Sequence, residues 1–380
     1  GYFNEVNIET PAVQGTTDQV DVNVGVTEKS TGSIMVGAGF SSSEGLVLSG
    51  SVSQNNVFGT GNRLSAQINS GSVNTVYSLS YTNPYYTING VSLGYDLYRR
   101  DVDATSLSDV SPYKTSTYGA GARFGLPINE RDFISLGLTY EQTSITTYSN
   151  SPVQYTTFVR DFGSDNDTLR LDSSWARDTR NSYLFPTKGL MQRAAAEVGT
   201  PGGSLRYYKL TLQHQQYFPL SKSFTLMLNG ELGYGEGYGS HTTLPFYKNF
   251  YAGGNSSVRG FKTGTLGPKD INGDALGGNE RVVGNVELYF PLPGLKDDQS
   301  LRMSAFVDTG ATFGPYNANA SGAYDGKYST FSFNDLRYSA GIAVLWVSPL
   351  GPLKFSLAQP LSKKTGDKTE IFQFTLGNTF

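Results

Sequence analysis

The sequence is dominated by segments in which apolar and polar residues alternate. Residues 134–141, 224–232 and 338–346 each carry large apolar side chains at every second position, with small or polar residues between them. Side chains at positions i and i+2 lie on the same face of a β-strand, so this pattern predicts strands with one apolar and one polar face. No stretch of the sequence has a sustained 3.6-residue apolar stripe. The pattern therefore predicts an all-β protein.

Two architectures suit such strands. A soluble sandwich or solenoid turns its apolar faces inward, whereas a membrane barrel turns them outward to lipid and keeps a polar lumen. The predicted strands are about nine to eleven residues long, the length that crosses a bilayer at a tilt. The 25 Tyr and 22 Phe, many of them at strand ends, suit the aromatic girdles of a membrane barrel. We therefore favour the membrane barrel over the sandwich.

The number of strands and the lengths of their connections support a closed barrel. Sixteen strands are predicted, and they begin near residues 32, 45, 62, 75, 90, 116, 132, 167, 189, 206, 223, 281, 301, 336, 351 and 370. Successive connections of such a barrel alternate between its two rims. The long connections, at 101–115, 145–166, 234–280 and 311–335, are all separated from one another by an even number of strands. All long loops should therefore leave one rim, and both termini should lie at the other rim, which is the periplasmic side of an outer-membrane barrel.

Composition removes several other classes of protein. The net charge of −3 provides no basic field for nucleic acid. The absence of Cys excludes disulfides, thiolate metal sites and cysteine catalysis, and two His offer little for a histidine metal site. The longest apolar run, of about seven residues near Ile342–Val347, is too short for a membrane-spanning helix. We find no nucleophile–base pair, and we expect no catalytic residue, metal or cofactor.

Residues 1–31 differ from the rest of the chain. They hold two short alternating segments, 3–8 and 20–26, joined by a polar turn. The first residues have neither the basic region nor the apolar core of a signal peptide, so we expect them to come from within a longer precursor. A plug, an extra hairpin or the end of a periplasmic domain would each fit this segment.

The longest predicted loop, 234–280, contains an Arg flanked by glycines and aromatic residues. The segment Val258-Arg259-Gly260-Phe261 follows Gly253-Gly254, a composition that favours a tightly folded loop. Glu287 and Asp308 alternate with apolar neighbours in the following strands, so their side chains should face the lumen. A guanidinium from the loop would pair strongly with such carboxylates, whereas a solvated Arg is the simpler alternative.

These motifs resemble a known family. Val258-Arg259-Gly260-Phe261, Phe306-Val307-Asp308-Thr309-Gly310 and a terminal strand ending in Phe380 are similar to the superfamily of outer-membrane assembly and two-partner secretion barrels. The resemblance implies a sixteen-stranded barrel (32–380) and makes residues 1–31 the end of the last periplasmic POTRA domain. It also implies that Arg259 contacts Asp308 and Glu287 in the lumen, and that the first and last strands meet in a weak lateral seam. We assign to this seam Gly32, Ser33, Ile34, Met35, Val36, Gly37, Phe372, Phe374, Leu376, Gly377 and Phe380.

The function implied by this resemblance is the folding and insertion of β-barrel proteins into the bacterial outer membrane through that seam. Its partners would be unfolded outer-membrane proteins, the surrounding lipid, and assembly lipoproteins that dock on the missing POTRA domains. The alternative is a two-partner secretion transporter that exports one dedicated substrate. No covalent bond changes in either role, so we expect no enzyme.

Overall fold

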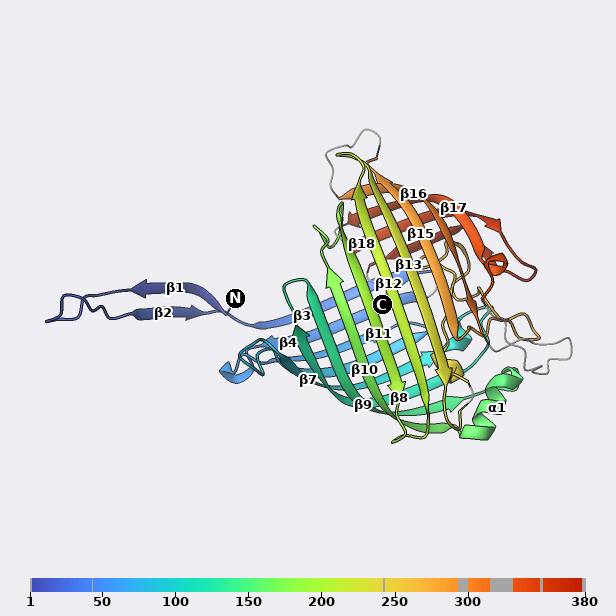
Figure 1. Ribbon diagram of the computed structural model, residues 1–380, viewed down its shortest axis with the longest axis horizontal. Helices are drawn as coiled ribbons and strands as arrows, with labels where there is room; N and C mark the ends of the chain where they lie inside the picture. The colour runs from blue at the N-terminus through green and yellow to red at the C-terminus, as the bar shows by residue number, and fades with distance from the viewer. Residues whose placement is uncertain are drawn as a thin grey trace.

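The computed structural model describes residues 2–42, 44–241, 243–292, 300–314, 331–348 and 351–377. Sixteen strands from these residues form a closed antiparallel barrel (Figure 1). Strands that are consecutive in the barrel pair with each other, and the last strand, β20, returns to pair with the first, β3. The predicted fold class is thereby confirmed.

The predicted strand starts agree with the observed ones to within two residues. In chain order the barrel strands are β3 (Gly32–Ser41), β4 (Gly45–Asn55), β5 (Arg63–Ser70), β6 (Asn74–Asn83), β7 (Ser92–Asp103), β8 (Lys114–Pro127), β9 (Asp132–Thr146), β10 (Asp165–Asp178), β11 (Gly189–Gly199), β12 (Tyr207–Pro219), β13 (Thr225–Gly237), β15 (Glu280–Phe290), β16 (Leu301–Phe313), β17 (Arg337–Ser348), β18 (Gly351–Ser362) and β20 (Phe372–Leu376).

Strand length varies more than the sequence predicted. β8, β9 and β10 have 14, 15 and 14 residues, whereas β5 has 8 and β6 has 10. The expectation of nine to eleven residues is wrong for the longer strands because their hydrogen-bonded ladders continue past the apolar belt into polar residues. The predicted final strand also starts later, at Phe372, because Thr369–Glu370 forms a separate short strand, β19, paired with β14 (Gly260–Phe261).

The two faces of the barrel wall follow the alternation in the sequence. On β9, Leu136, Leu138 and Tyr140 are exposed on the outer surface. Thr139 and Glu141, which alternate with them along the strand, are buried. The wall is therefore apolar outside and polar inside, as in a barrel surrounded by lipid. No helix among the described residues has both the length and the hydropathy needed to cross a membrane.

A hairpin outside the barrel precedes the first barrel strand. Its strands β1 (Phe3–Glu9) and β2 (Asn23–Glu28) pair antiparallel and project away from the barrel at the left of Figure 1. Val6 and Val26 are paired neighbours, as are Ile8 and Val24, so one face of the hairpin is apolar. All four side chains are exposed in this chain.

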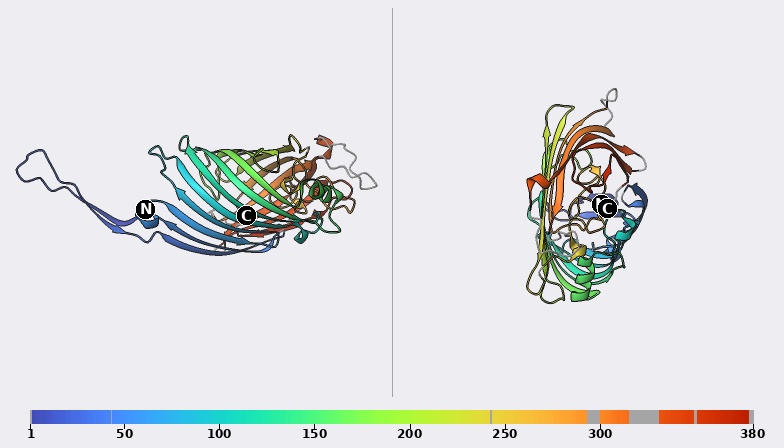
Figure 2. Two further views of the ribbon diagram at one scale, coloured as in Figure 1. Left: turned by 90° about the horizontal axis from the view of Figure 1, so that it is seen from below. Right: turned by 90° about the vertical axis from the view of Figure 1, so that its right-hand side faces the viewer.

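An aromatic cluster closes part of the long-loop rim. The helix α1 (Val153–Phe162) lies in the connection between β9 and β10, at the opposite end of the barrel from the hairpin (Figures 1 and 2). Its Tyr155 stacks on Phe246 with ring centroids 4.0 Å apart, and Phe158 packs edge-on against the same ring. Phe246 belongs to the connection between β13 and β15, so the cluster joins two long loops.

Candidate functional site

The connection between β13 and β15 folds back into the barrel lumen. It spans residues 238–279, because β13 continues to Gly237 and β15 begins at Glu280; residues 234–237 of the predicted loop belong to the barrel wall. In the end-on view of Figure 2, the gold-coloured chain of this connection lies within the barrel outline, inside wall strands of similar colour. Val258, Arg259, Gly260 and Phe261 are all buried there.

Glycine allows the loop to approach the inner wall closely. Gly260 has a φ of +87°, which L side chains rarely adopt, and a Cβ at this position would lie 3.1 Å from the Cβ of Ala358 on β18. Gly260 and Phe261 form the two-residue strand β14, which pairs with Glu370 and Thr369 of β19. The loop motif is therefore attached to the segment that leads directly into the last barrel strand.

Arg259 lies between two carboxylates of the barrel wall. Its Nε donates to Asp308 Oδ2 at 2.7 Å and its Nη2 to Asp308 Oδ1 at 2.8 Å, so the carboxylate is held by two parallel hydrogen bonds. Nη1 donates to Glu287 Oε1 at 3.2 Å, and the guanidinium carbon lies 3.3 Å from the ring centroid of Phe306. The structure thus brings together the three charged residues that the sequence analysis singled out.

Other groups complete the hydrogen bonding of these carboxylates. Asn285 Nδ2 donates to Asp308 Oδ1 at 2.8 Å, and the Ser304 hydroxyl donates to Glu287. The backbone N–H of Arg259 also donates to Asp308 Oδ2, at 3.1 Å. Arg259, Asp308 and Glu287 are exposed by only 2%, 0% and 4%. A buried ion pair is maintained when its remaining polar atoms are satisfied, and this one meets that condition closely.

A second ionic cluster attaches the start of the same loop to another part of the wall, formed by β9, β10 and β11. Lys248 Nζ lies 2.7 Å from Glu197 Oε1 on β11 and 3.5 Å from Glu141 Oε2 on β9. Arg170 of β10 forms an ion pair with Glu141, and the Tyr207 hydroxyl donates to Glu197. Burial in the loop would lower the pKa of Lys248, but the two carboxylates raise it well above its ordinary value. The sequence analysis missed this cluster.

The seam between the last and first strands is short. Among the described residues, β20 and β3 share two register pairs, Thr375 with Ser41 and Leu376 with Phe40. The neighbouring pair of strands, β18 and β20, shares five. Phe40 and Phe374 stack across the seam with their centroids 5.2 Å apart. The seam therefore combines one aromatic contact with few backbone pairs.

Of the predicted seam residues, the structure pairs only Leu376 across the seam within the described parts of the two strands. Gly32, Ser33, Ile34, Met35, Val36 and Gly37 pair with β4 on one side, and no described residue of β20 pairs with them on the other. Phe372 pairs with β18 rather than with β3. The first half of β3 extends beyond the described end of β20 because the two strands meet with a large stagger. Gly377 lies close to Ala38 and Gly39, and Phe380 is outside the described residues.

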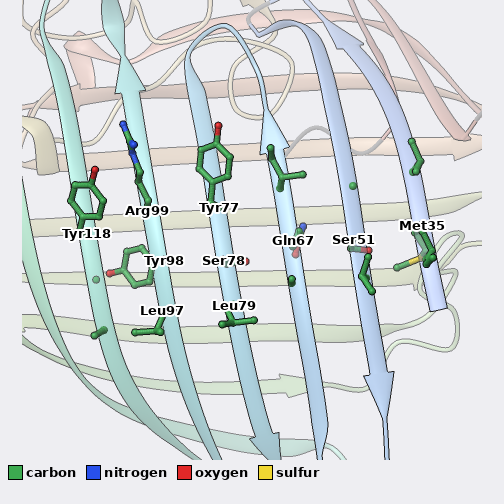
Figure 3. A pocket seen from close by; sticks show the side chains of 18 of the residues that line it. Met35, Ser51, Gln67, Tyr77, Ser78, Leu79, Leu97, Tyr98, Arg99 and Tyr118 are labelled. Carbon is green, nitrogen blue, oxygen red and sulfur yellow. The ribbon is translucent and has the colours of Figure 1, made fainter. Parts of the chain in front are cut away.

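An apolar hollow lies on the outer wall next to this part of β3. It has a volume of about 840 Å³ and extends from β3 to β9. Small residues such as Gly50, Ala66 and Ala120 form its floor between larger apolar side chains. Figure 3 shows Leu79 and Leu97 at one level of the hollow, and Tyr77, Arg99 and Tyr118 side by side at another, nearer the long-loop rim. The wall beside the seam is thus both concave and apolar.

Residues 270–274 form an ordinary turn. Asp270 Oδ1 accepts hydrogen bonds from the backbone N–H groups of Asn272 and Asp274, which is an Asx-turn arrangement. Within the described parts of the chain, no cluster of three His, Cys, Asp or Glu side chains could hold a metal ion.

Comparison with known proteins gives consistent matches. Residues 56–380 match the model of the Omp85 superfamily domain. The whole chain is 43% identical to 51% of the outer membrane protein assembly factor BamA of Neisseria meningitidis. It superposes with a TM-score of 0.91, at 32% identity, on 76% of the crystallised chain of Haemophilus ducreyi BamA lacking POTRA domains 1–3, with the whole of this chain covered. CdiB of Acinetobacter baumannii shares the fold alone, with a TM-score of 0.58 and 14% identity over 98% of this chain and 64% of that one.

The chain spans about half the length of the curated relatives that it matches. The matched part is the whole of this chain. This barrel is of the bacterial outer-membrane type, and the chain belongs to the Omp85 superfamily.

Proposed function

We propose that the full-length protein folds and inserts other β-barrel proteins into the outer membrane, and that the seam between β3 and β20 is where it acts. The observation that carries this proposal is the contrast between two register pairs at the seam and five or more between all other neighbouring barrel strands in the described chain. A barrel that serves only as a pore gains nothing from one weak junction. The identity with BamA over the whole chain supports the same role.

The edge of β3 offers an incoming strand a template. Backbone groups that lack partners in hydrocarbon each cost several kcal/mol, so an unpaired strand edge in a membrane strongly favours pairing. Residues 32–37 of β3 have no strand partner on this side among the described residues, and Ile34 and Val36 point outward with 76% and 87% of their surface exposed. A client strand would pair there by β-augmentation, and the seam would widen as further strands follow.

The outer wall near the seam suits the proposed lipid partner. β5 and β6 are seven and five residues shorter than β9, which corresponds to roughly 15 to 25 Å of strand before tilt is considered. Where the apolar band of the wall is lower as well, hydrophobic mismatch would thin the bilayer, and thinner lipid presents a smaller barrier to insertion. The hollow beneath Tyr77 and Tyr118 gives lipid chains further apolar surface next to the same edge.

The remaining partners depend on the part of the protein that precedes the barrel. We propose that residues 1–31 are the end of the last POTRA domain, and that residues 32–380 form the barrel. The apolar face of the β1–β2 hairpin would pack on the rest of that domain. Unfolded clients and assembly lipoproteins would approach through the POTRA domains, with both termini on the periplasmic side, the rim of the shorter connections.

Depletion of the full-length protein tests the proposal. Loss of many outer-membrane barrels on depletion, restored by the full-length gene, is the expected result. Loss of a single secreted protein, with barrel levels unchanged, would instead identify a two-partner secretion transporter. A direct assay would follow the folding of a urea-unfolded barrel client into liposomes that contain the full-length protein, with empty liposomes as the control.

A further inference from the structure

One side chain of the lumen loop reaches the strand that forms the seam. Asn255 lies four residues before Arg259 and outside the Val-Arg-Gly-Phe motif. Its Nδ2 donates to Thr375 Oγ1 on β20 at 3.0 Å, and its Oδ1 accepts from Ser356 Oγ on β18, also at 3.0 Å. Its backbone carbonyl accepts from Lys354 Nζ at 3.3 Å. Both ends of the amide are therefore used, one on each of two neighbouring strands.

The position of Thr375 gives this contact its importance. Thr375 is the register partner of Ser41 across the seam, one of the two pairs that join β20 to β3 in the described chain. The strand alternates, so Phe372, Phe374 and Leu376 face away from the lumen while Thr375 faces inward. Asn255 thus holds from the inside the residue that closes the seam.

The other contacts between loop and last strand lie further from the seam pairs. Gln373 Nε2 donates to the carbonyl of Phe261 at 2.8 Å, and its Oε1 accepts from the N–H of Gly260 at 3.3 Å. Gln373 is opposite Ser356 of β18, and no described residue of β3 pairs with it. These bonds attach β20 to the loop motif, whereas the Asn255 bond acts where β20 meets β3.

We propose that Asn255 is a positioning residue that couples the seating of the loop to the closure of the seam. With the loop seated, Asn255 holds Thr375 in register with Ser41, and the two-pair junction stays closed. Without this bond, β20 remains attached to the loop through Gln373, and the end that meets β3 is held to it by the two register pairs and by the contacts of Phe374 with Phe40 and Ser42. The inference rests on the proposed function for its biological meaning, but the coupling itself is a property of the barrel.

Disulfide trapping can measure seam closure directly, because residues 1–380 contain no cysteine that would compete. Phe40→Cys and Leu376→Cys, placed at a register pair, would be introduced together into the full-length protein in membranes. The initial rate of oxidation then reports the closed fraction. Asn255→Ala should raise the ratio of open to closed seam about fivefold, the effect of one lost hydrogen bond of roughly 1 kcal/mol, and should slow oxidation by the corresponding fall in the closed fraction. Asn272→Ala, an exposed Asn in the same loop, should leave the rate unchanged.

A double-mutant cycle tests whether the bond to Thr375 is responsible. Thr375→Val should slow oxidation as much as Asn255→Ala, and the double variant should be no slower than either single variant. Amide hydrogen exchange of residues 258–261 should not change in the Asn255→Ala protein, because the ionic contacts of Arg259 are intact. This last measurement separates a loosened seam from a displaced loop.

The outcomes distinguish the two proposals. An unchanged oxidation rate in Asn255→Ala, or fully additive effects in the double variant, would overturn the coupling while leaving the assembly function standing. Normal coupling in a full-length protein that does not fold barrel clients would overturn the proposed function instead. Faster exchange at residues 258–261 in Asn255→Ala would show that Asn255 seats the loop rather than the seam strand, and would also overturn the coupling.

Discussion

Replacement of Arg259 by Ala should release the loop from the lumen wall. The substitution removes three hydrogen bonds to carboxylates and leaves Asp308 and Glu287 buried without their cation. Removing one partner of a buried ion pair costs about 3–5 kcal/mol. We expect the lower end, about 3 kcal/mol, because Asn285 and Ser304 still donate to the two carboxylates. That free energy corresponds to a roughly 150-fold increase in the population of the unseated loop.

Native-state hydrogen exchange of the full-length protein measures this equilibrium. The amides of residues 249–266 should exchange roughly 150-fold faster in the Arg259→Ala protein, provided that they exchange through unseating of the loop. Arg259→Lys should restore part of the protection, because an ammonium keeps the charge but not the two-pronged geometry. Arg160→Ala is the matched control, since Arg160 lies exposed on α1 beside Asp161 and such surface pairs contribute little.

A further variant separates the effect of the unpaired carboxylates from the effect of the lost Arg259 hydrogen bonds. Adding Asp308→Asn and Glu287→Gln to Arg259→Ala removes the uncompensated charges, so much of the lost protection should return. An acceleration of less than about threefold in Arg259→Ala alone would refute the reasoning, because the ion pair would then contribute almost nothing to the seated state.

Three other predictions concern the glycine of the motif, the seam and the rim. Gly260→Ala should unseat the loop far more than Gly273→Ala, because both residues have positive φ but a Cβ meets β18 only at Gly260; equal exchange rates at 258–261 would contradict this. A disulfide between Phe40→Cys and Leu376→Cys should block client folding until a reductant is added, whereas continued folding with the bond intact would exclude opening at the seam. Burial, with a smaller effect from Arg206, lowers the pKa of His241, so its neutral form stabilises the folded rim above pH ~6.5 and this stability is lost as the pH falls. Exchange in α1, which packs on His241, should therefore rise between pH 7.5 and pH 5.5 after correction for intrinsic rates, and a His241→Gln protein with the same rise would contradict the assignment.

The strands and the inward carboxylates could be predicted because they follow a local rule. Side chains alternate between the two faces of a strand, so the apolar neighbours of a residue show which face it occupies. Asp308 and Glu287 could therefore be placed in the lumen without knowledge of the barrel's shape. Gln373 carried the same signal, a polar residue between Phe372 and Phe374, and could have been found in the same way.

The seam and the loop contacts could not be predicted by such a rule. The pairing of Leu376 with Phe40, rather than with a residue near Gly32, depends on the stagger accumulated around all sixteen strands. Asn255 and Lys248 lie in an irregular loop, where spacing in the sequence does not determine which wall a side chain meets. The lengths of β8 and β9 were underestimated because backbone pairing continues where the apolar pattern has ended.

The pairing of β14 with β19 also constrains how this barrel itself folds. Gly260 and Glu370 are separated by more than a hundred residues, and their contact lies inside the closed wall. We expect the loop to be in the interior before β20 meets β3, because the β14–β19 pair attaches it to the segment that leads into β20. Such non-local contacts form slowly, because the entropy of ordering the intervening chain is lost before they are made. The final step of folding would then be the closure of the ring around a loop already in place. In that order of events, the loop positions the last strand before it pairs with the first.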